Sequence, residues 1–461
     1  MARSGRFALA LAVVLVLAGA APVAGDRTGE TGAVGPKHDL VGEKNELNSV
    51  WQEVDGESES VVIETEDFEP DYDPEKILSR VEQLRGLSAT QGITLHEYDA
   101  ENGSEYDMRD EFGAIRPIGA QTLQLYSNAS TERRQPLGYA VERQAAVHIY
   151  LMDDADLAEY GISQEVVLAH ELVHALQFQN DLLSSSRREM RSQFQYWTTD
   201  TRLVTAALVE GDAMWVTEQY LARYGESNYS VTSYNRSLAR SAWPHSVAGT
   251  PYYYGYEFYA MAGSAPDERS DEIESPPNST AELLHPDERV ERAEISPPEI
   301  PDSENLTRYH ADTVGELVVR HSLRINNLSF ARAAEVADGW AGDRMYYYAA
   351  AGARGPATHW VTAWENEREA REFASAWRSM LAANGARSTG ETPTGDTLFV
   401  PAGDHAPGIH YVVEREGATV RITAAEEPDT AEQLAEAAQS AETVQSAGAM
   451  QSDAENATVA A

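Results

Sequence analysis

Hydrophobic residues cover almost every side of the stretch from Ser163 to Asn180, and only three strongly polar residues lie inside its apolar run. A helix that is apolar all round is buried. The pattern therefore predicts a core helix that starts at Ser163, a residue type that caps helices. The stretch Arg202–Tyr224 is also largely apolar and predicts a second buried helix, with Asp200 as its cap and Gly225 at its end.

The remaining periodicity predicts an α+β chain. Apolar residues between 77 and 87 recur at helical spacing, and the folded region is expected to begin there. The stretch Tyr139–Met152 predicts strands, because apolar and polar residues alternate between 147 and 152 as in a half-buried strand. Further helices are predicted at Gly315–Val336 and Glu367–Ala383, and further strands at Thr358–Trp364, Thr397–Val400, Ile409–Val413 and Thr419–Thr423. Residues 264–304 are acidic and Pro-rich and are expected to form a long loop.

The three polar residues of the first helix are His170, Glu171 and His174, an HExxH sequence. Burying a neutral polar group without a partner costs roughly 2–7 kcal/mol, so these side chains need partners. The two histidines share a helix face and can both reach one zinc at about 2.0–2.1 Å. Glu171 lies about 100° round the helix, where it can serve as base to a metal-bound water. The alternative is a surface helix with ordinary His and Glu, against which the apolar surroundings argue.

A zinc site that keeps a position open for chemistry needs a third protein ligand. Gln177 and Asn180 stand where the pattern HExxHxxGxxH has Gly and His, which excludes that class. Glu210, inside the apolar run of the second helix, is the predicted third ligand, although a structural pairing with an arginine would also explain a buried carboxylate there. Gly211 follows it at a cost of about 1 kcal/mol relative to Ala, which a close approach of another helix would explain. The alternative ligands are Glu218, Glu189 and Asp212.

The stretches AHELVHALQ at Ala169–Gln177 and VEGDA at Val209–Ala213 resemble the gluzincin metallopeptidase clan. Residues 74 to 425 also resemble a group of mostly uncharacterised secreted prokaryotic proteins with an HExxH domain, which includes haloarchaeal surface proteins. Three later stretches carry this resemblance: Pro251–Phe258, Pro276–Glu288 and Ala337–Arg344. The resemblance implies a zincin-like catalytic domain, mostly helical with an antiparallel edge strand. That strand is expected at Val147–Met152, where an extended peptide can add as another strand.

The chain departs from the thermolysin-type pattern at one position. Met214 stands four residues after Glu210, where that pattern has an Asp that supports a ligand histidine. The resemblance therefore does not identify what orients the ligand histidines.

The charge of the chain narrows the choice of partners. The formal net charge is −40, and lysine occurs only at Lys37, Lys44 and Lys76. Such an acidic surface repels nucleic acid and anionic membranes, so neither is expected as a partner. An acidic excess with Arg in place of Lys is also typical of adaptation to high salt, where screening removes the self-repulsion; the alternative is an acidic protein with disordered tails. The chain has no Cys and hence no disulfides.

The first 25 residues have the form of a signal peptide. Arg3 and Arg6 precede an apolar core at Phe7–Leu17, and small residues follow at Ala18–Ala24. An uncleaved membrane anchor is the alternative. The N-x-[ST] sequons fit an exported chain whose loops carry glycans. These features predict a secreted or cell-surface glycoprotein.

The patterns divide the chain into five segments. They are the signal peptide 1–25, an acidic flexible spacer 26–73, the zincin-like catalytic domain 74–355, a small C-terminal α+β extension 356–425 and a disordered acidic tail 426–461. The predicted function is a secreted zinc metalloendopeptidase that hydrolyses peptide or protein substrates, with His170, His174 and Glu210 on Zn²⁺ and Glu171 as base. The alternatives are a non-catalytic surface protein with a structural metal site and a metal-dependent hydrolase of another substrate.

Overall fold

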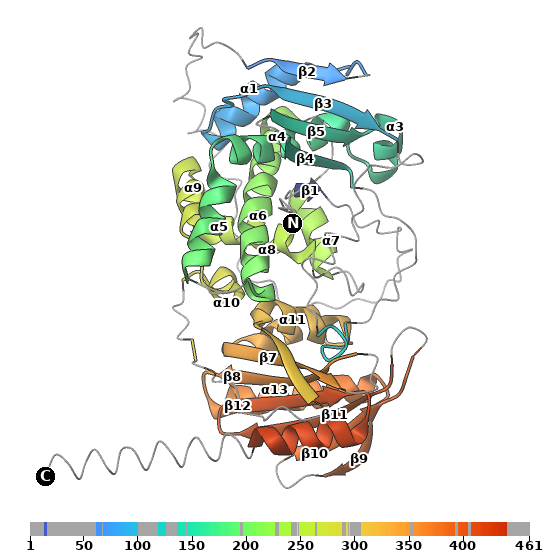
Figure 1. The fold of residues 1–461 in the computed structure, drawn as a ribbon. Coiled ribbons are helices and arrows are strands. Elements are labelled where there is room, and N and C mark those ends of the chain that lie inside the picture. Colours follow the sequence, from blue (N-terminus) through green and yellow to red (C-terminus); the bar gives the residue numbers. More distant parts are fainter. Residues whose placement is uncertain are drawn as a thin grey trace, which may run out of the picture.

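The computed structural model contains two β-sheets with a group of helices between them (Figure 1). It confirms the mixed α and β composition that the sequence predicts. The structure describes residues 13–15, 61–66, 68–99, 119–125, 136–143, 146–193, 197–225, 230–240, 247, 249–262, 265–287, 292–293, 295, 306–350, 355–391, 395–403 and 407–439.

The first sheet has five strands in the order β1-β4-β5-β3-β2. The strands β2, β3 and β5 run parallel, β4 is antiparallel to β5, and β1 is antiparallel to β4. Their bounds are Val13–Leu15 (β1), Ile63–Glu66 (β2), Ile93–Tyr98 (β3), Gly138–Arg143 (β4) and Ala146–Met152 (β5). The expectation that the strand at Val147–Met152 edges the sheet is wrong, because β5 lies inside it and β4 is the antiparallel strand beyond. Apart from β1, the expected signal peptide lies outside the described residues.

Helix α1 (Pro74–Arg85) lies between β2 and β3 in the chain, and the other helices before the second sheet follow β5. These are α3 (Asp154–Leu157), η2 (Ala158–Tyr160), α4 (Gln164–Gln179), α5 (Leu182–Gln193), α6 (Thr199–Tyr224), α7 (Val231–Arg240), α8 (Thr250–Ala262), α9 (Pro266–Glu274) and α10 (Thr280–Leu284). Helix α4 packs on β4 and β5, and α6 packs beside α4 and α8. Among the described residues, no helix is long and apolar enough to cross a bilayer.

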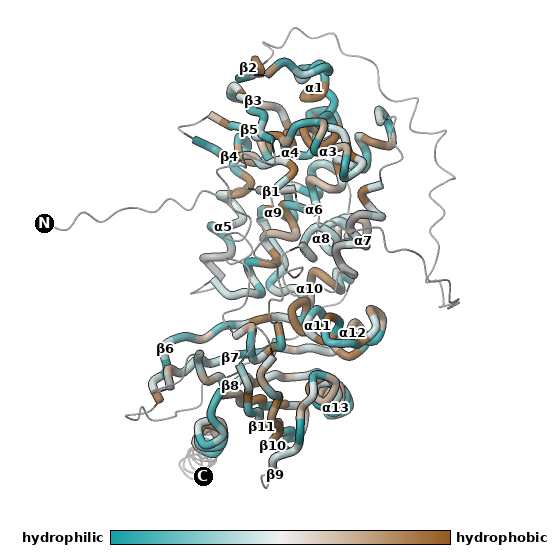
Figure 2. The backbone as a smooth tube through the Cα atoms, turned by 90° about the vertical axis from the view of Figure 1, so that its right-hand side faces the viewer, coloured by the Kyte–Doolittle hydropathy of each residue, from teal (hydrophilic) through white to brown (hydrophobic). Residues whose placement is uncertain are grey.

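The second sheet has seven strands, all paired antiparallel, in the order β6-β7-β8-β12-β11-β10-β9. Their bounds are Leu306–Asp312 (β6), Trp340–Ala350 (β7), Ala357–Trp364 (β8), Arg387–Glu391 (β9), Gly395–Val400 (β10), Ile409–Glu416 (β11) and Thr419–Ala425 (β12). Helix α13 (Glu367–Ala383) packs on β8, β11 and β12, and hydrophilic and hydrophobic residues alternate along its turns (Figure 2). Helices α11 (Gly315–Ile325) and α12 (Phe330–Ala337) lie between this sheet and the helices of the first region.

Helix α6 takes part in two hydrophobic cores. Its first half, including Leu203 and Leu208, belongs to the core that continues into the second sheet. Its second half, including Met214 and Tyr220, belongs to the core shared with α4 and the first sheet. Glu210 lies on the helix between these two halves, so both cores fix its position.

The predicted close approach at Gly211 is confirmed. A Cβ added to Gly211 would lie 2.3 Å from the backbone carbon of Gly255 in α8, and one added to Gly255 would lie 1.8 Å from the oxygen of Ala207. Only glycine allows two helix backbones to approach this closely. The crossing of α6 and α8 therefore depends on both glycines.

Several predicted boundaries are wrong. The expected division between 355 and 356 falls between β7 and β8, neighbours in one sheet, so the C-terminal region begins at β6. The expected flexible spacer already contains β2, which pairs with β3. Residues 428–439, expected in the disordered tail, are helical and bury Leu434; residues 440–461 lie outside the described residues. The expected loop 264–304 contains helices α9 and α10.

Candidate metal centre

The structure brings His170, His174 and Glu210 together in the buried space between α4 and α6. The Nε2 atoms of the two histidines are 3.1 Å apart, and Oε2 of Glu210 lies 3.6 Å from Nε2 of His170 and 3.5 Å from Nε2 of His174. Among the described residues this is the one group of His, Asp and Glu side chains whose ligand atoms converge so closely. Both histidines are fully buried, and Glu210 is 6 % exposed.

These separations suit a metal ion better than they suit hydrogen bonds. Tetrahedral ligands at about 2.0–2.1 Å from zinc stand roughly 3.3–3.4 Å from one another. The three observed distances lie on both sides of that value, whereas 3.5 and 3.6 Å are too long for hydrogen bonds between these atoms. The Oε2 atom of Glu210 has no hydrogen-bond partner among the described residues. The group could therefore hold a metal ion.

The hydrogen bonds behind the imidazoles leave their Nε2 atoms without protons. Nδ1 of His174 lies 2.8 Å from Oε1 of Gln177. Nδ1 of His170 lies 3.3 Å from Oγ1 of Thr217, whose hydroxyl already donates to the Ala213 carbonyl. Both partners accept, so each Nδ1 carries the proton of a neutral ring. Two Nε2 lone pairs and a carboxylate then face one another in a buried space, an arrangement that a cation relieves.

Burial keeps the His170 imidazole in the neutral form that binds metals. Desolvation lowers the pKa of His170 to about 4, against the opposing effect of the nearby Glu210 carboxylate. The His170 ring is therefore available as a ligand at neutral pH.

Glu171 lies on α4 beside the backbone of β4. A Cβ added to Gly138 would stand 3.1 Å from Oε1 of Glu171, so β4 passes directly next to this carboxylate. The Glu171 side chain is fully buried and is not part of the converging group. Glu171 thus lies next to the candidate metal ligands and next to β4, the second strand from the edge of the first sheet, where only β1 lies beyond it.

The alternative ligands have other partners. Glu218 accepts a hydrogen bond from the backbone N–H of Val231. Asp212 pairs with Arg85 and Arg269 at 2.7 and 2.8 Å. Glu189 lies on α5 outside the converging group. Among the four predicted candidates, only Glu210 faces both histidines.

Two cap predictions differ from the structure. Ser163 is the N-cap residue of α4, but its side chain makes no capping hydrogen bond. Thr198, not Asp200, caps α6, in a reciprocal pair with Thr201. Asp200 is buried in the first turn of the helix and accepts two hydrogen bonds from Thr280, so it joins α6 to α10.

Sequence reasoning missed Gln177 and Thr217 as partners of the ligand histidines. Gln177 had entered the argument only as a departure from the HExxHxxGxxH pattern. Its place on a helix apolar on nearly every side was the available signal, because a buried amide needs partners as much as a buried imidazole does.

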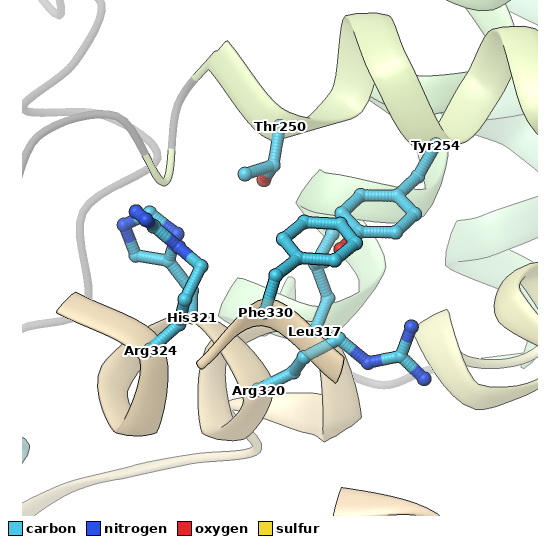
Figure 3. A pocket seen from close by; sticks show the side chains of 7 residues that line it. All are labelled: Thr250, Tyr254, Leu317, Arg320, His321, Arg324 and Phe330. Atoms are coloured by element: carbon cyan, nitrogen blue, oxygen red, sulfur yellow. The ribbon is translucent and has the colours of Figure 1, made fainter. Parts of the chain in front are cut away.

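A pocket elsewhere in the molecule contains none of these residues (Figure 3). It lies between α8, α11 and α12, and its lining residues are Thr250, Tyr254, Leu317, Arg320, His321, Arg324 and Phe330. Tyr254 is one of several aromatic residues near α8, and it packs over Arg320 there. His285 contacts Glu316 at 3.2 Å, which is a structural pairing.

A family model described as a domain of unknown function (DUF8575) matches residues 304–435. No curated protein and no solved structure matches the chain. The matched residues coincide with the second sheet, from β6 into the helix at 428–439, and all four residues of the candidate metal centre lie outside them. The comparisons thus attach no activity to the candidate metal centre.

Proposed function

We propose that the protein is a secreted or cell-surface zinc metallopeptidase whose ligands are His170, His174 and Glu210. The observation that carries this proposal is the convergence of two imidazole nitrogens and a carboxylate oxygen in one buried space. Two imidazoles and a carboxylate form a ligand set that suits zinc, and three protein ligands are typical of catalytic sites.

The chemistry divides between the metal and Glu171. A zinc ion in such a site supplies Lewis-acid activation of water and of the substrate carbonyl. Glu171 takes a proton from the attacking water and later gives it to the leaving amine. Its carboxylate is suited to this because it lies on the same helix as two ligands without joining them.

A peptide substrate is supported by the position of β4. On this side of the first sheet only β1 (Val13–Leu15) lies beyond β4. The two strands pair antiparallel, with Leu15 opposite Gly138. Gly138 is the residue whose backbone passes Glu171. An extended peptide in the place of β1 would gain main-chain hydrogen bonds and would pass the proposed base. The segment that occupies this place belongs to the expected signal peptide, whose cleavage would leave the edge open.

The burial of the site is the one observation that favours a structural metal instead. His170, Glu171 and His174 are fully buried, and structural zinc sites are closed. A closed site, however, uses four protein ligands as a rule, and only three converge among the described residues. A structural site also has no use for a carboxylate in the position of Glu171.

The first test is metal content. Purified protein should bind about one zinc per chain, and His170→Ala or His174→Ala should abolish tight binding. Full zinc occupancy in the double variant would refute the assignment. Unchanged zinc affinity in Glu210→Ala would remove Glu210 from the ligand set but leave the histidines in place.

The second test separates the enzyme from the structural site. Glu171→Gln keeps size and hydrogen bonding and removes the base, so peptide hydrolysis should fall about 10²–10⁴-fold while folding and zinc content stay unchanged. The matched control is Glu165→Gln, the same substitution one and a half turns earlier on α4, at a side chain that is 36 % exposed. A Glu171→Gln protein that cleaves unfolded protein in high salt as fast as its parent would exclude the proposed mechanism.

A further inference from the structure

Gln177 connects the candidate metal centre to a buried ionic cluster. Its Oε1 faces Nδ1 of His174 at 2.8 Å, and its Nε2 donates to Oδ2 of Asp212 at 2.8 Å and to the carbonyl of Val209 at 3.1 Å. Gln177 and Asp212 are both fully buried. The amide therefore spans the space between α4 and α6, with one end on a proposed ligand and the other on a carboxylate.

The two ends of this amide cannot be exchanged. The Asp212 carboxylate and the Val209 carbonyl only accept hydrogen bonds, so the NH₂ group must face them. The carbonyl end must then face His174 and accept from its Nδ1–H. That fixes the imidazole as the tautomer whose Nε2 lone pair points toward Glu210 and His170.

Asp212 is itself held from two further helices. Nε of Arg85 on α1 donates to its Oδ2 at 2.7 Å, and Nε of Arg269 on α9 donates to its Oδ1 at 2.8 Å. Arg85 also donates to the carbonyl of Pro266, and Arg269 donates to the carbonyl of Leu84. Both arginines are buried. Helices α1, α4, α6 and α9 thus meet at one carboxylate, which cannot rotate without breaking several charged hydrogen bonds.

His170 has much weaker support of this kind. Its Nδ1 contacts a threonine hydroxyl at 3.3 Å, and no charged group stands behind that hydroxyl among the contacts of the described residues. The two proposed ligand histidines therefore differ: one is backed by an amide and an ionic cluster, the other by a single hydroxyl.

We propose that Gln177 is a positioning residue for His174, and that Asp212 with Arg85 and Arg269 holds Gln177 in the orientation this requires. The proposal rests on the metal centre of the proposed function. In the thermolysin-type pattern, a carboxylate at the place of Met214 supports a ligand histidine. In this chain the amide of Gln177 lies between the Asp212 carboxylate and the His174 imidazole and takes that role. If the cluster only joined four helices, replacing Gln177 would lower stability but would leave the tautomer of His174 and the zinc affinity unchanged.

Gln177→Met tests the proposal without exposing an uncompensated charge, because Asp212 keeps both arginines. Loss of an outer hydrogen-bond partner typically weakens metal binding 10–100-fold, so the zinc dissociation constant should rise by that factor in a chelator competition. The matched control is Gln179→Met on the same helix, where the side chain contacts Thr90 and Gln91, and it should bind zinc as the parent does.

A spectroscopic readout keeps the test independent of activity and of variant folding. In the zinc-free parent, ¹⁵N-labelled His174 should be the Nδ1–H tautomer, and in Gln177→Met it should become a mixture. An Nε2–H tautomer in the parent, or a folded Gln177→Met variant with parental tautomer and zinc affinity, would overturn the proposal. A parent that binds no zinc but shows the Nδ1–H tautomer would refute the proposed function and leave the hydrogen-bond assignment intact.

Discussion

Around α4 and α6 the buried core contains two histidines and four acids, whereas the core between the C-terminal sheet and α13 is rich in tryptophan. In the C-terminal core Trp360 meets Phe373 and Trp377 edge to face, with ring centres 6.0 and 5.3 Å apart, and Trp364 stacks on Phe373 at 4.5 Å. Such contacts need no bound ligand, because aromatic rings stabilise one another as they exclude water. The first region instead brings two imidazole nitrogens and a carboxylate oxygen together in a group that could hold a metal ion.

The difference assigns separate tasks to the two regions. The first half of α6 belongs to the same hydrophobic core as the aromatic residues, while the polar groups of the candidate metal centre lie on α4 and near the middle of α6. Glu210 stands where the two meet. The C-terminal region can therefore act as a fixed support that holds one proposed ligand against the two on α4, and four substitutions or additions test that division.

The largest effect on stability is expected from Trp360→Ala. Removing a buried tryptophan costs about 3–5 kcal/mol through lost transfer energy and the cavity left behind. The indole N–H of Trp360 has no hydrogen-bond partner among the described residues, so the loss is one of packing. Denaturant unfolding should show the decrease, and Trp360→Phe should show a smaller one. The zinc affinity of the folded variant should match the parent; a tenfold weaker affinity would mean that the two cores are not independent.

Zinc itself should stabilise the first region. A ligand that binds only the folded state adds about 2.7 kcal/mol at a hundredfold excess over its dissociation constant. Hydrogen exchange should slow in α4 and α6 when zinc is added and stay unchanged in β8 and β11. Equal slowing in both regions, or none in either, would contradict the division of tasks. The same zinc-dependent increment should appear in Trp360→Ala.

The elements that the sequence predicted well are those defined by local periodicity. Each of three helices, the HExxH helix, the second buried helix and α13, has its hydrophobic pattern within one continuous stretch of sequence. The candidate ligands followed because a polar residue in an apolar helix is conspicuous, and Glu210 was chosen over Asp212 although both are buried acids of the same helix.

What the sequence did not predict depends on contacts between distant segments. Arg269 lies in a stretch so acidic and Pro-rich that a loop was expected, yet the stretch contains α9, and Arg269 on this helix shares Asp212 with Arg85. The strand β6 pairs with β7 across two intervening helices, so the domain boundary was placed within a sheet. Gln177 entered only as a residue that replaces the glycine of the HExxHxxGxxH pattern, because its partner Asp212 is 35 residues away in the sequence. None of these pairings has a local signature.

The crossing of α6 and α8 offers a smaller perturbation. In Gly255→Ala the added Cβ would lie 1.8 Å from the carbonyl oxygen of Ala207, so α8 must move away from α6. Overpacking of this kind typically costs 1–3 kcal/mol, and the shift of α6 should also weaken zinc binding because Glu210 follows Ala207 by less than one turn. Gly403→Ala is the matched control, since its Cβ would meet nothing within 4 Å. Loss of stability with unchanged zinc affinity would show that Glu210 is not fixed through this crossing.

At neutral pH the smallest expected effect concerns His359 on β8, a fully buried histidine of the second sheet. Its Nδ1 lies 2.9 Å from the hydroxyl of Thr423, and burial, followed by the charge of Arg421, lowers its pKa to about 3. An unfolded histidine titrates near 6.5, so below that pH the unfolded chain takes up a proton that the folded chain refuses. Stability from this group is complete above pH 6.5 and is lost toward pH 3, by at most about 1.4 kcal/mol per pH unit.

Replacing this imidazole should remove its share of the acid sensitivity. His359→Gln should unfold with a pH slope smaller by about one proton between pH 6 and 4, measured on zinc-free protein by denaturant titration at each pH. Thr423→Val keeps the buried imidazole and removes only its partner, so this control should be less stable at every pH with the parental slope. If His359→Gln keeps the full slope, His359 does not cause the acid sensitivity. Its folded pKa would then lie near the unfolded value, because any lowering of that pKa by burial must make stability depend on pH.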